Sequence, residues 1–222
     1  MEKPGVILIL SGGIDSTVLL YHLLDKGYEV EALSFNYGQI HHRELKSAYF
    51  QAQQAGVEHK TLGIMNLASI LGENLLTNSD TWLSADARGE PRKMTTVPNR
   101  NMVSISMATS YAITSGRHAV AIGTHLGDIG YPDCREVFSH AIAQAMALCH
   151  YDPILLVRPF VRMTKAEVIQ RGHELGVDFF QTYSCYRGEE MHCGRCVACV
   201  ERIQAFRTAG VKDLTVYQSL PT

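Results

Sequence analysis

The stretch "LILSGGIDSTVLL" at residues 8–20 decides the fold of this chain. An apolar run stops at two glycines, an aspartate and two hydroxyl residues follow, and apolar residues then resume at helical spacing. We therefore predict a strand at residues 5–10, a tight turn, and a helix that ends at Gly27. Amides at such a turn are unpaired and lie at the positive end of the helix dipole, which predicts a phosphate or pyrophosphate site.

Two familiar phosphate-binding loops do not match this turn. The dinucleotide fingerprint G-x-G-x-x-G is missing, and the Walker loop requires a lysine that the stretch lacks. Asp15 is the informative residue, because a carboxylate beside a bound phosphate repels it unless a divalent cation lies between them. The turn therefore predicts a nucleotide bound together with Mg²⁺.

The rest of the chain alternates between strand and helix patterns. Further strands are expected at residues 29–35, 58–64, 118–123 and 154–157, and helices at 42–55, 101–115, 134–149, 164–174 and 197–208. "TKAE" at 164–167 fits a capping box at the start of one helix. The stretch 77–100 is rich in Ser, Thr, Asp and Pro and is expected to be a long loop with a functional role. This order predicts an α/β fold with a parallel sheet.

Four cysteines gather near the C-terminus. "SCYRGEEMHCGRCVAC" places Cys185, Cys193, Cys196 and Cys199 close together, which suits a tetrahedral Zn²⁺ site. Iron–sulfur ligation stays open on spacing alone, and zinc is preferred because no other motif points to redox work. Four protein ligands leave no open position, so the metal is expected to be structural. The other two cysteines, Cys134 and Cys149, are expected to be small buried residues.

Composition limits the classes of protein to consider. The 222 residues are 46% hydrophobic and 19% charged with a net charge of -2, as in a globular domain without the basic face that nucleic acid requires. No apolar stretch approaches the roughly 20 residues of a membrane span, and no signal peptide is visible. We expect a cytoplasmic protein with a nucleotide-binding part at 1–180 and a metal-binding segment at 181–222.

"SGGIDS" resembles the SGGxDS loop of the PP-loop ATP pyrophosphatases, a superfamily that cleaves ATP between its α and β phosphates. The resemblance implies that the nucleotide contacts Leu10, Ser11, Gly12, Gly13, Ile14, Asp15, Ser16 and Thr17, with Gly123 and Thr124 of "GTHLGD". It also implies that Asp128 joins Asp15 at Mg²⁺; a turn aspartate is the alternative. Departing pyrophosphate needs a cation, which Lys165 can supply unless it is a solvated first-turn lysine.

Four further stretches narrow the resemblance. "FNYGQIHHRE" at 35–44, "VPNRN" at 97–101, "YPDCREVF" at 131–138 and "SCYRG" at 184–188 resemble the 7-cyano-7-deazaguanine synthases. That family converts 7-carboxy-7-deazaguanine, ATP and ammonia into the 7-cyano product on a doubly wound α/β sheet with a small zinc-bearing appendage. Asn99 stands where the commoner family sequence has glycine, and "GTHLGDIG" also departs from the usual form. The resemblance allows a homodimer, for which the sequence offers no interface motif.

The acceptor site is expected around the same motifs. Arg100 and Arg135 are candidates to grip a carboxylate, Asp133 to accept from a purine N–H, and Tyr131 to stack on the ring. A structural ion pair or helix cap is the alternative for each. Two rival functions stay open: a related adenylating enzyme that stops at the amide or transfers sulfur through Cys134, and a zinc-ribbon module that binds RNA without catalysis.

Overall fold

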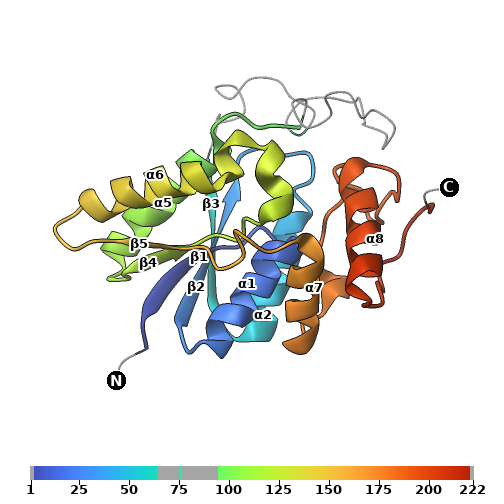
Figure 1. The fold of residues 1–222 in the computed structure, drawn as a ribbon, viewed down its shortest axis with the longest axis horizontal. Coiled ribbons are helices and arrows are strands. Elements are labelled where there is room, and N and C mark those ends of the chain that lie inside the picture. Colours follow the sequence, from blue (N-terminus) through green and yellow to red (C-terminus); the bar gives the residue numbers. More distant parts are fainter. Residues whose placement is uncertain (1–2, 65–75, 77–94, 221–222) are drawn as a thin grey trace.

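One parallel sheet forms the centre of the protein. The computed structural model describes residues 3–64, Leu76 and residues 95–220. In these ranges five strands pair in the order β3-β2-β1-β4-β5 (Figure 1). They are β1 (Gly5–Ile9), β2 (Glu29–Asn36), β3 (Glu58–Gly63), β4 (Ala119–Ala121) and β5 (Leu155–Val157). Every pairing is parallel, as the alternation of strands and helices predicts.

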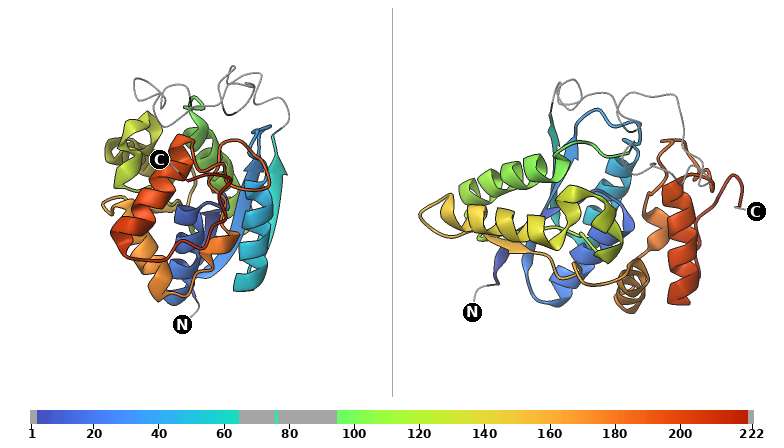
Figure 2. Two further views of the ribbon diagram at one scale, coloured as in Figure 1. Left: turned by 90° about the vertical axis from the view of Figure 1, so that its right-hand side faces the viewer. Right: turned by 45° about the horizontal axis from the view of Figure 1, so that its top comes forward.

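Helices cover both faces of the sheet (Figures 1 and 2). One face carries α1 (Ile14–Asp25), α2 (Glu44–Ala55) and α7 (Lys165–Glu174), and the other carries α5 (Arg100–Thr114) and α6 (Glu136–Leu148). Alternate residues of β1 point into two separate cores: Val6 and Leu8 into the first, Ile7 into the second. The doubly wound architecture is therefore confirmed.

Local sequence signals set several helix boundaries. The capping box before α7 forms as predicted: the Thr164 hydroxyl accepts from the amide of Glu167 at 3.3 Å, and the Glu167 carboxylate accepts from the amide of Thr164 at 2.6 Å. Helix α6 begins two residues later than predicted, because Pro132–Cys134 forms a 3-10 turn and Arg135 caps the helix. Residues 77–94 of the predicted long loop lie outside the described residues.

The last helix, α8 (Val197–Ala209), packs beside α7 (Figures 1 and 2). Its Arg202 is fully buried and donates to the Thr182 hydroxyl at 2.8 Å and to the Phe179 carbonyl at 2.9 Å. Asp213, 3.5 Å away, supplies the opposite charge that a buried guanidinium needs. The domain boundary at 180/181 stays a prediction. None of the helices in the described ranges has the length and apolarity to cross a bilayer.

Candidate functional site

The turn between β1 and α1 is shaped to leave amides available. Gly12 has a φ of +85°, and a Cβ there would lie 2.1 Å from the Glu44 carbonyl oxygen, so no larger residue fits. The hydroxyls of Ser11 and Ser16 lie 3.0 Å apart across the turn. Thr17 supplies the first helical amide bond, to the Gly13 carbonyl at 3.1 Å. The amides just before it in α1 therefore lack helical acceptors, as an anion site requires.

Unpaired buried polar atoms gather around this turn. Among the described residues, the buried side-chain atoms without a hydrogen-bond partner include Asp15 Oδ1, Thr17 Oγ1, Thr124 Oγ1 and His125 Nε2. Buried polar groups in proteins are nearly always paired, so such a cluster marks a place where a polar ligand completes the hydrogen bonding. The geometry fits a phosphate-bearing ligand with an accompanying cation.

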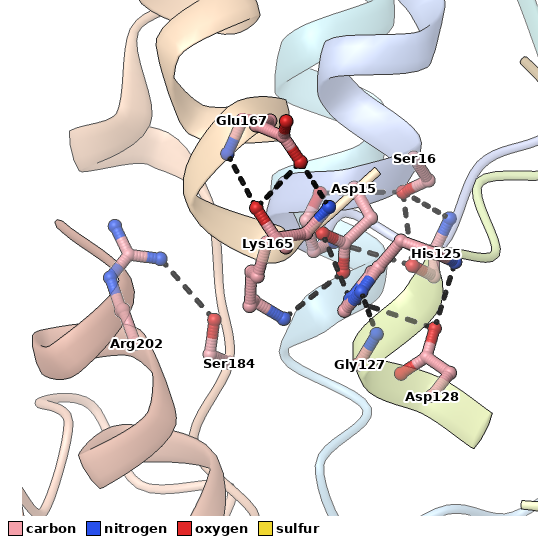
Figure 3. A network of polar contacts seen from close by, with 12 residues as sticks. Asp15, Ser16, His125, Gly127, Asp128, Lys165, Glu167, Ser184 and Arg202 are labelled. Carbon is pink, nitrogen blue, oxygen red and sulfur yellow. Dashed lines mark hydrogen bonds and ion pairs between the residues drawn. The ribbon is translucent and has the colours of Figure 1, made fainter. Parts of the chain in front are cut away.

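Four charged or titratable side chains converge beside the turn, from the start of α1, the start of α7 and the segment after β4 (Figure 3). Lys165 Nζ donates to Asp15 Oδ2 at 3.1 Å. The His125 ring places Nε2 between two carboxylates, 3.5 Å from Asp15 Oδ1 and 3.6 Å from Asp128 Oδ2. Its Nδ1 accepts from the amide of Gly127 at 3.0 Å, so in the neutral ring the proton lies on Nε2 and faces the carboxylates.

The pKa values reflect this cluster. Burial would raise the pKa of Asp15, but Lys165 and His125 outweigh it and hold that pKa well below its usual range. Burial raises the pKa of Asp128, and the Asp15 carboxylate adds to the rise although His125 opposes it. Burial lowers the pKa of Lys165, yet the two carboxylates outweigh it and the net shift is upward. Two carboxylates in mutual repulsion, beside an ammonium, form an arrangement that a divalent cation and phosphate oxygens would complete.

A cavity of about 290 Å³ opens at the carboxyl ends of the strands. The sequence-predicted residues that line it are Leu10, Ser11, Gly13, Ile14, Asp15, Ser16, Arg100, Gly123, Thr124, Asp128, Tyr131 and Lys165. Gly12 lies in the same turn and Thr17 lies in the first turn of α1, and neither lines the cavity. The structure therefore brings nearly all of the predicted nucleotide-binding residues together around one space.

The predicted acceptor residues divide into two groups. Arg100 lines the cavity and donates to the Tyr37 hydroxyl at 3.4 Å, and Tyr131 lines it with its hydroxyl 3.1 Å from that of Thr95. Asp133 and Arg135 do not line the cavity. The Asp133 carboxylate instead accepts from the amide of Asn101 at 3.0 Å, at the start of α5, and Arg135 is exposed before α6.

The four clustered cysteines come together as predicted. Cys185, Cys193, Cys196 and Cys199 are buried, and their ligand atoms all lie within 4.8 Å of one another, which suits a tetrahedral metal. Their segment touches the candidate nucleotide site: the amide of Tyr183 donates to the Gly12 carbonyl at 3.0 Å. Tyr183, Ser184, Tyr186, Ala198 and Glu201 line the same cavity.

The two remaining cysteines differ from each other. Cys134 is buried as expected and lines the cavity, where burial, aided by Asp128 and Asp133, raises the pKa of its thiol to about 12. The expectation that Cys149 is buried is wrong, because it is exposed at the C-cap of α6. Burial is the default expectation for a lone cysteine, but the end of the helix places this one at the surface.

Comparison with known proteins supplies independent information. Residues 5–210 match the family described as "Queuosine biosynthesis protein QueC". Proteins named 7-cyano-7-deazaguanine synthase from Methanoregula boonei and Caldicellulosiruptor saccharolyticus are each 43% identical, over 96% of this chain and 98% and 95% of their own length.

Solved structures share the fold at lower identity. The U34-tRNA thiolase NcsA of Methanococcus maripaludis, described with its [4Fe-4S] cluster, superposes with a TM-score of 0.51 at 21% identity, covering 94% of this chain and 68% of that one. The NMN synthetase of Francisella tularensis gives a TM-score of 0.53 at 15% identity, covering 95% of this chain and 79% of that one. These likenesses extend to the fold alone.

Proposed function

This chain belongs to the QueC family of queuosine biosynthesis proteins, and on that premise we propose that it converts 7-carboxy-7-deazaguanine, ATP and ammonia into 7-cyano-7-deazaguanine. Membership makes the chain an ATP-dependent enzyme that forms carbon–nitrogen bonds. The observation that carries the proposal is the convergence of Asp15, Asp128 and Lys165 on one cavity with the amides of the β1–α1 turn. That combination suits a nucleotide triphosphate and the pyrophosphate that leaves it.

The groups at the nucleotide end of the cavity are proposed to have three roles: binding phosphate, binding Mg²⁺ and stabilising the leaving pyrophosphate. The first-turn amides of α1 and the hydroxyls of Ser11 and Ser16 donate to phosphate oxygens. Asp15 and Asp128 would hold Mg²⁺, which supplies positive charge against the phosphates. Lys165 stays protonated because the carboxylates raise its pKa, so it can stabilise the charge that develops on departing pyrophosphate.

The chemistry follows from the poor reactivity of a carboxylate. One carboxylate oxygen attacks the α-phosphorus of ATP, pyrophosphate leaves, and an acyl adenylate forms. Ammonia attacks the acyl carbon and AMP departs with that oxygen, which leaves the amide. The amide oxygen then attacks the α-phosphorus of a second ATP and displaces a second pyrophosphate. Departure of AMP with that oxygen, together with loss of both N–H protons, gives the nitrile. The protein contributes mainly by holding the reacting groups in line and by excluding water.

The acceptor end is assigned from the residues that reach the cavity. Arg100 is proposed to hold the substrate carboxylate and Tyr131 to pack on the ring. Asp133 is proposed to act indirectly: its bond to the amide of Asn101 fixes the start of α5 and with it Arg100. A substrate contact by Arg135 stays a prediction.

Zinc is proposed as the metal of the four-cysteine cluster. The thiolates form a closed set in a buried pocket and leave no position for a substrate, so the metal would stabilise the fold. Elemental analysis of protein purified from medium that contains both zinc and iron tests this directly. One zinc per chain supports the proposal, and iron with acid-labile sulfide contradicts it.

The sulfur-transfer alternative is weaker in this structure. Metal would occupy the four clustered cysteines. Among the described residues, the thiol that lines the cavity and could act as the nucleophile is that of Cys134. With a pKa of about 12 it carries almost no thiolate at neutral pH, and the thiolate is the nucleophile.

Product mass tests the proposed function. The protein is incubated with the heterocyclic acid, ATP, Mg²⁺ and an ammonium salt, and the products are resolved by mass spectrometry while AMP and pyrophosphate are counted. The proposal predicts the nitrile with two AMP and two pyrophosphate for each product. Accumulation of the amide with one AMP, or of a thio product, would replace it by one of the alternatives.

A further inference from the structure

Glu44 presents a carboxylate to the cavity with one oxygen uncommitted. It is the first residue of α2, lines the cavity, and has a side chain that is 16% exposed. Its Oε1 accepts from Gln39 Nε2 at 3.1 Å and lies 3.5 Å from His41 Nε2. Its Oε2 has no hydrogen bond or ion pair with any residue that the structure describes. A half-paired carboxylate at a cavity wall is an arrangement that a ligand donor would complete.

Gln39 fixes the orientation of this carboxylate. Gln39 is 2% exposed; its Oε1 accepts from the amide of Tyr37 at 3.0 Å, and its Nε2 donates to the Phe35 carbonyl at 3.1 Å. Both ends of the amide are thus tied to the backbone at the end of β2. The remaining N–H therefore holds Glu44 Oε1 in one direction, which presets the carboxylate for a ligand.

The cavity has two electrostatic ends. Lys165 interacts with Asp15, Asp128 and Glu201 at the nucleotide end. Arg100 donates to the Tyr37 hydroxyl at 3.4 Å, and the Glu44 carboxylate is among the groups that raise the pKa of Arg100. The ring-bearing residues of the lining are Phe35, Tyr37, His41, Tyr131, Tyr183 and Tyr186. Glu44 therefore belongs to the end with Arg100, which the proposed function assigns to the acceptor.

We propose that Glu44 recognises the donor edge of the acceptor heterocycle, the adjacent ring N–H and exocyclic amino group of a guanine-type base. An ionised carboxylate only accepts hydrogen bonds and matches two neighbouring donors, whereas an adenine-type edge presents a ring acceptor that it repels. The inference rests on the proposed function and deepens it, because it names the residue that selects guanine-type acids. It also transfers the acceptor role that the sequence suggested for Asp133 to a residue that reaches the cavity.

Ligand binding without turnover tests the assignment. Titration calorimetry in the absence of ATP compares 7-carboxy-7-deazaguanine with the analogue that lacks the exocyclic amino group. Wild type is expected to prefer the amino compound by about tenfold or more, the size of a hydrogen bond to a charged group. Glu44→Ala should bring the ratio close to one, and Glu44→Gln should fall between. Glu58→Ala, which removes an exposed carboxylate on β3, should keep the wild-type ratio.

Thermal unfolding and metal content of each variant identify any that fail to fold, and Gln39→Leu then provides a second test through the orientation of Glu44. It should reduce the preference while leaving both oxygens of the carboxylate in place. An unchanged ratio in folded Glu44→Ala overturns the proposal. A separate titration with a non-hydrolysable ATP analogue overturns it as well if the loss of affinity is confined to that nucleotide, which would assign Glu44 to the adenine. Failure of wild type to bind either compound overturns it too. Normal discrimination without nitrile formation contradicts the proposed function alone.

Discussion

The amide of Tyr183 donates to the carbonyl of Gly12 at 3.0 Å, and this bond joins the four-cysteine segment to the candidate phosphate-binding turn. Cys185 follows two residues later, and Ser184 between them donates its amide to His192 Nε2 at 3.0 Å. A metal that fixes Cys185 therefore also fixes the backbone that holds Gly12. The four-cysteine cluster and the candidate nucleotide site are therefore parts of one arrangement.

Metal removal is accordingly expected to weaken ATP binding before it unfolds the protein. Partial removal by a chelator should lower the affinity for a non-hydrolysable ATP analogue by about tenfold or more, because the turn loses its support. Calorimetric titration together with metal analysis measures the relation. Cys149→Ser, which changes an exposed cysteine, is the control. If folded, metal-free protein bound ATP with normal affinity, the four-cysteine cluster would not support the nucleotide site.

Lys165 is expected to act on the transition state. Lys165→Met should lower the rate of pyrophosphate release by about 10²- to 10³-fold, the usual effect of removing one group that stabilises developing charge. Lys165→Arg should restore part of the rate because it keeps the charge. Lys46→Met, an exposed position on α2, serves as the control and should match wild type. A rate for Lys165→Met within threefold of wild type would exclude this role.

The cysteines should differ sharply in reactivity. At pH 8 the thiolate fraction of a thiol with a pKa of about 12 is on the order of one in ten thousand, so Cys134 should resist iodoacetamide. Exposed Cys149 should be alkylated first, and the metal should protect the four clustered residues. Peptide mapping by mass spectrometry identifies the modified sites. Rapid alkylation of Cys134 in the folded protein would revive the sulfur-transfer alternative.

Glu31 is expected to give the fold a pH dependence at acid pH. Burial would raise the pKa of Glu31, but hydrogen bonds from Tyr111 and Lys60 lower it below 4.5. The contacts of the ionised Glu31 with Tyr111 and Lys60 therefore stabilise the fold above about pH 4.5. This stabilisation is lost as the pH falls through the lowered pKa of Glu31 in the folded protein. Glu31→Gln should cost about 1–3 kcal/mol at pH 7.

Urea unfolding of wild type and Glu31→Gln in parallel measures this difference, since any acid-induced metal loss affects both proteins alike. The gap between their free energies of unfolding should narrow as the pH falls below 4.5. Glu58→Gln on the neighbouring strand is the control. A gap that stays constant from pH 7 to pH 3 would mean that the ionised carboxylate contributes no stability.

The features of this structure that depend on residues close together in the chain could be predicted from the sequence. The strand–turn–helix at Ser11–Thr17, the capping box of Thr164 and the spacing of the clustered cysteines are all local patterns, and each forms as predicted. Helix α6 was misplaced by two residues because Pro132 starts a separate 3-10 turn, a choice that depends on packing against α5.

Residues whose roles depend on distant partners were harder to find. His125 lies inside the quoted "GTHLGD" stretch, but its position between two carboxylates depends on Asp15, which is 110 residues earlier in the chain. Glu44 closes the "FNYGQIHHRE" stretch, and only the fold shows that it lines the same cavity as Arg100. The hydrogen bond that the Asp133 carboxylate accepts from the amide of Asn101 was also out of reach of local patterns, because it joins residues 32 positions apart.

The fate of the two carboxylate oxygens tests the central claim most directly. The acid is labelled with ¹⁸O at both oxygens and converted with unlabelled ATP and ammonia, and the released AMP and pyrophosphate are examined by mass spectrometry. Transfer of AMP to oxygen in both rounds predicts one ¹⁸O atom in each of the two AMP molecules and none in pyrophosphate. Label in inorganic phosphate, pyrophosphate or water would show that the oxygens leave by another route.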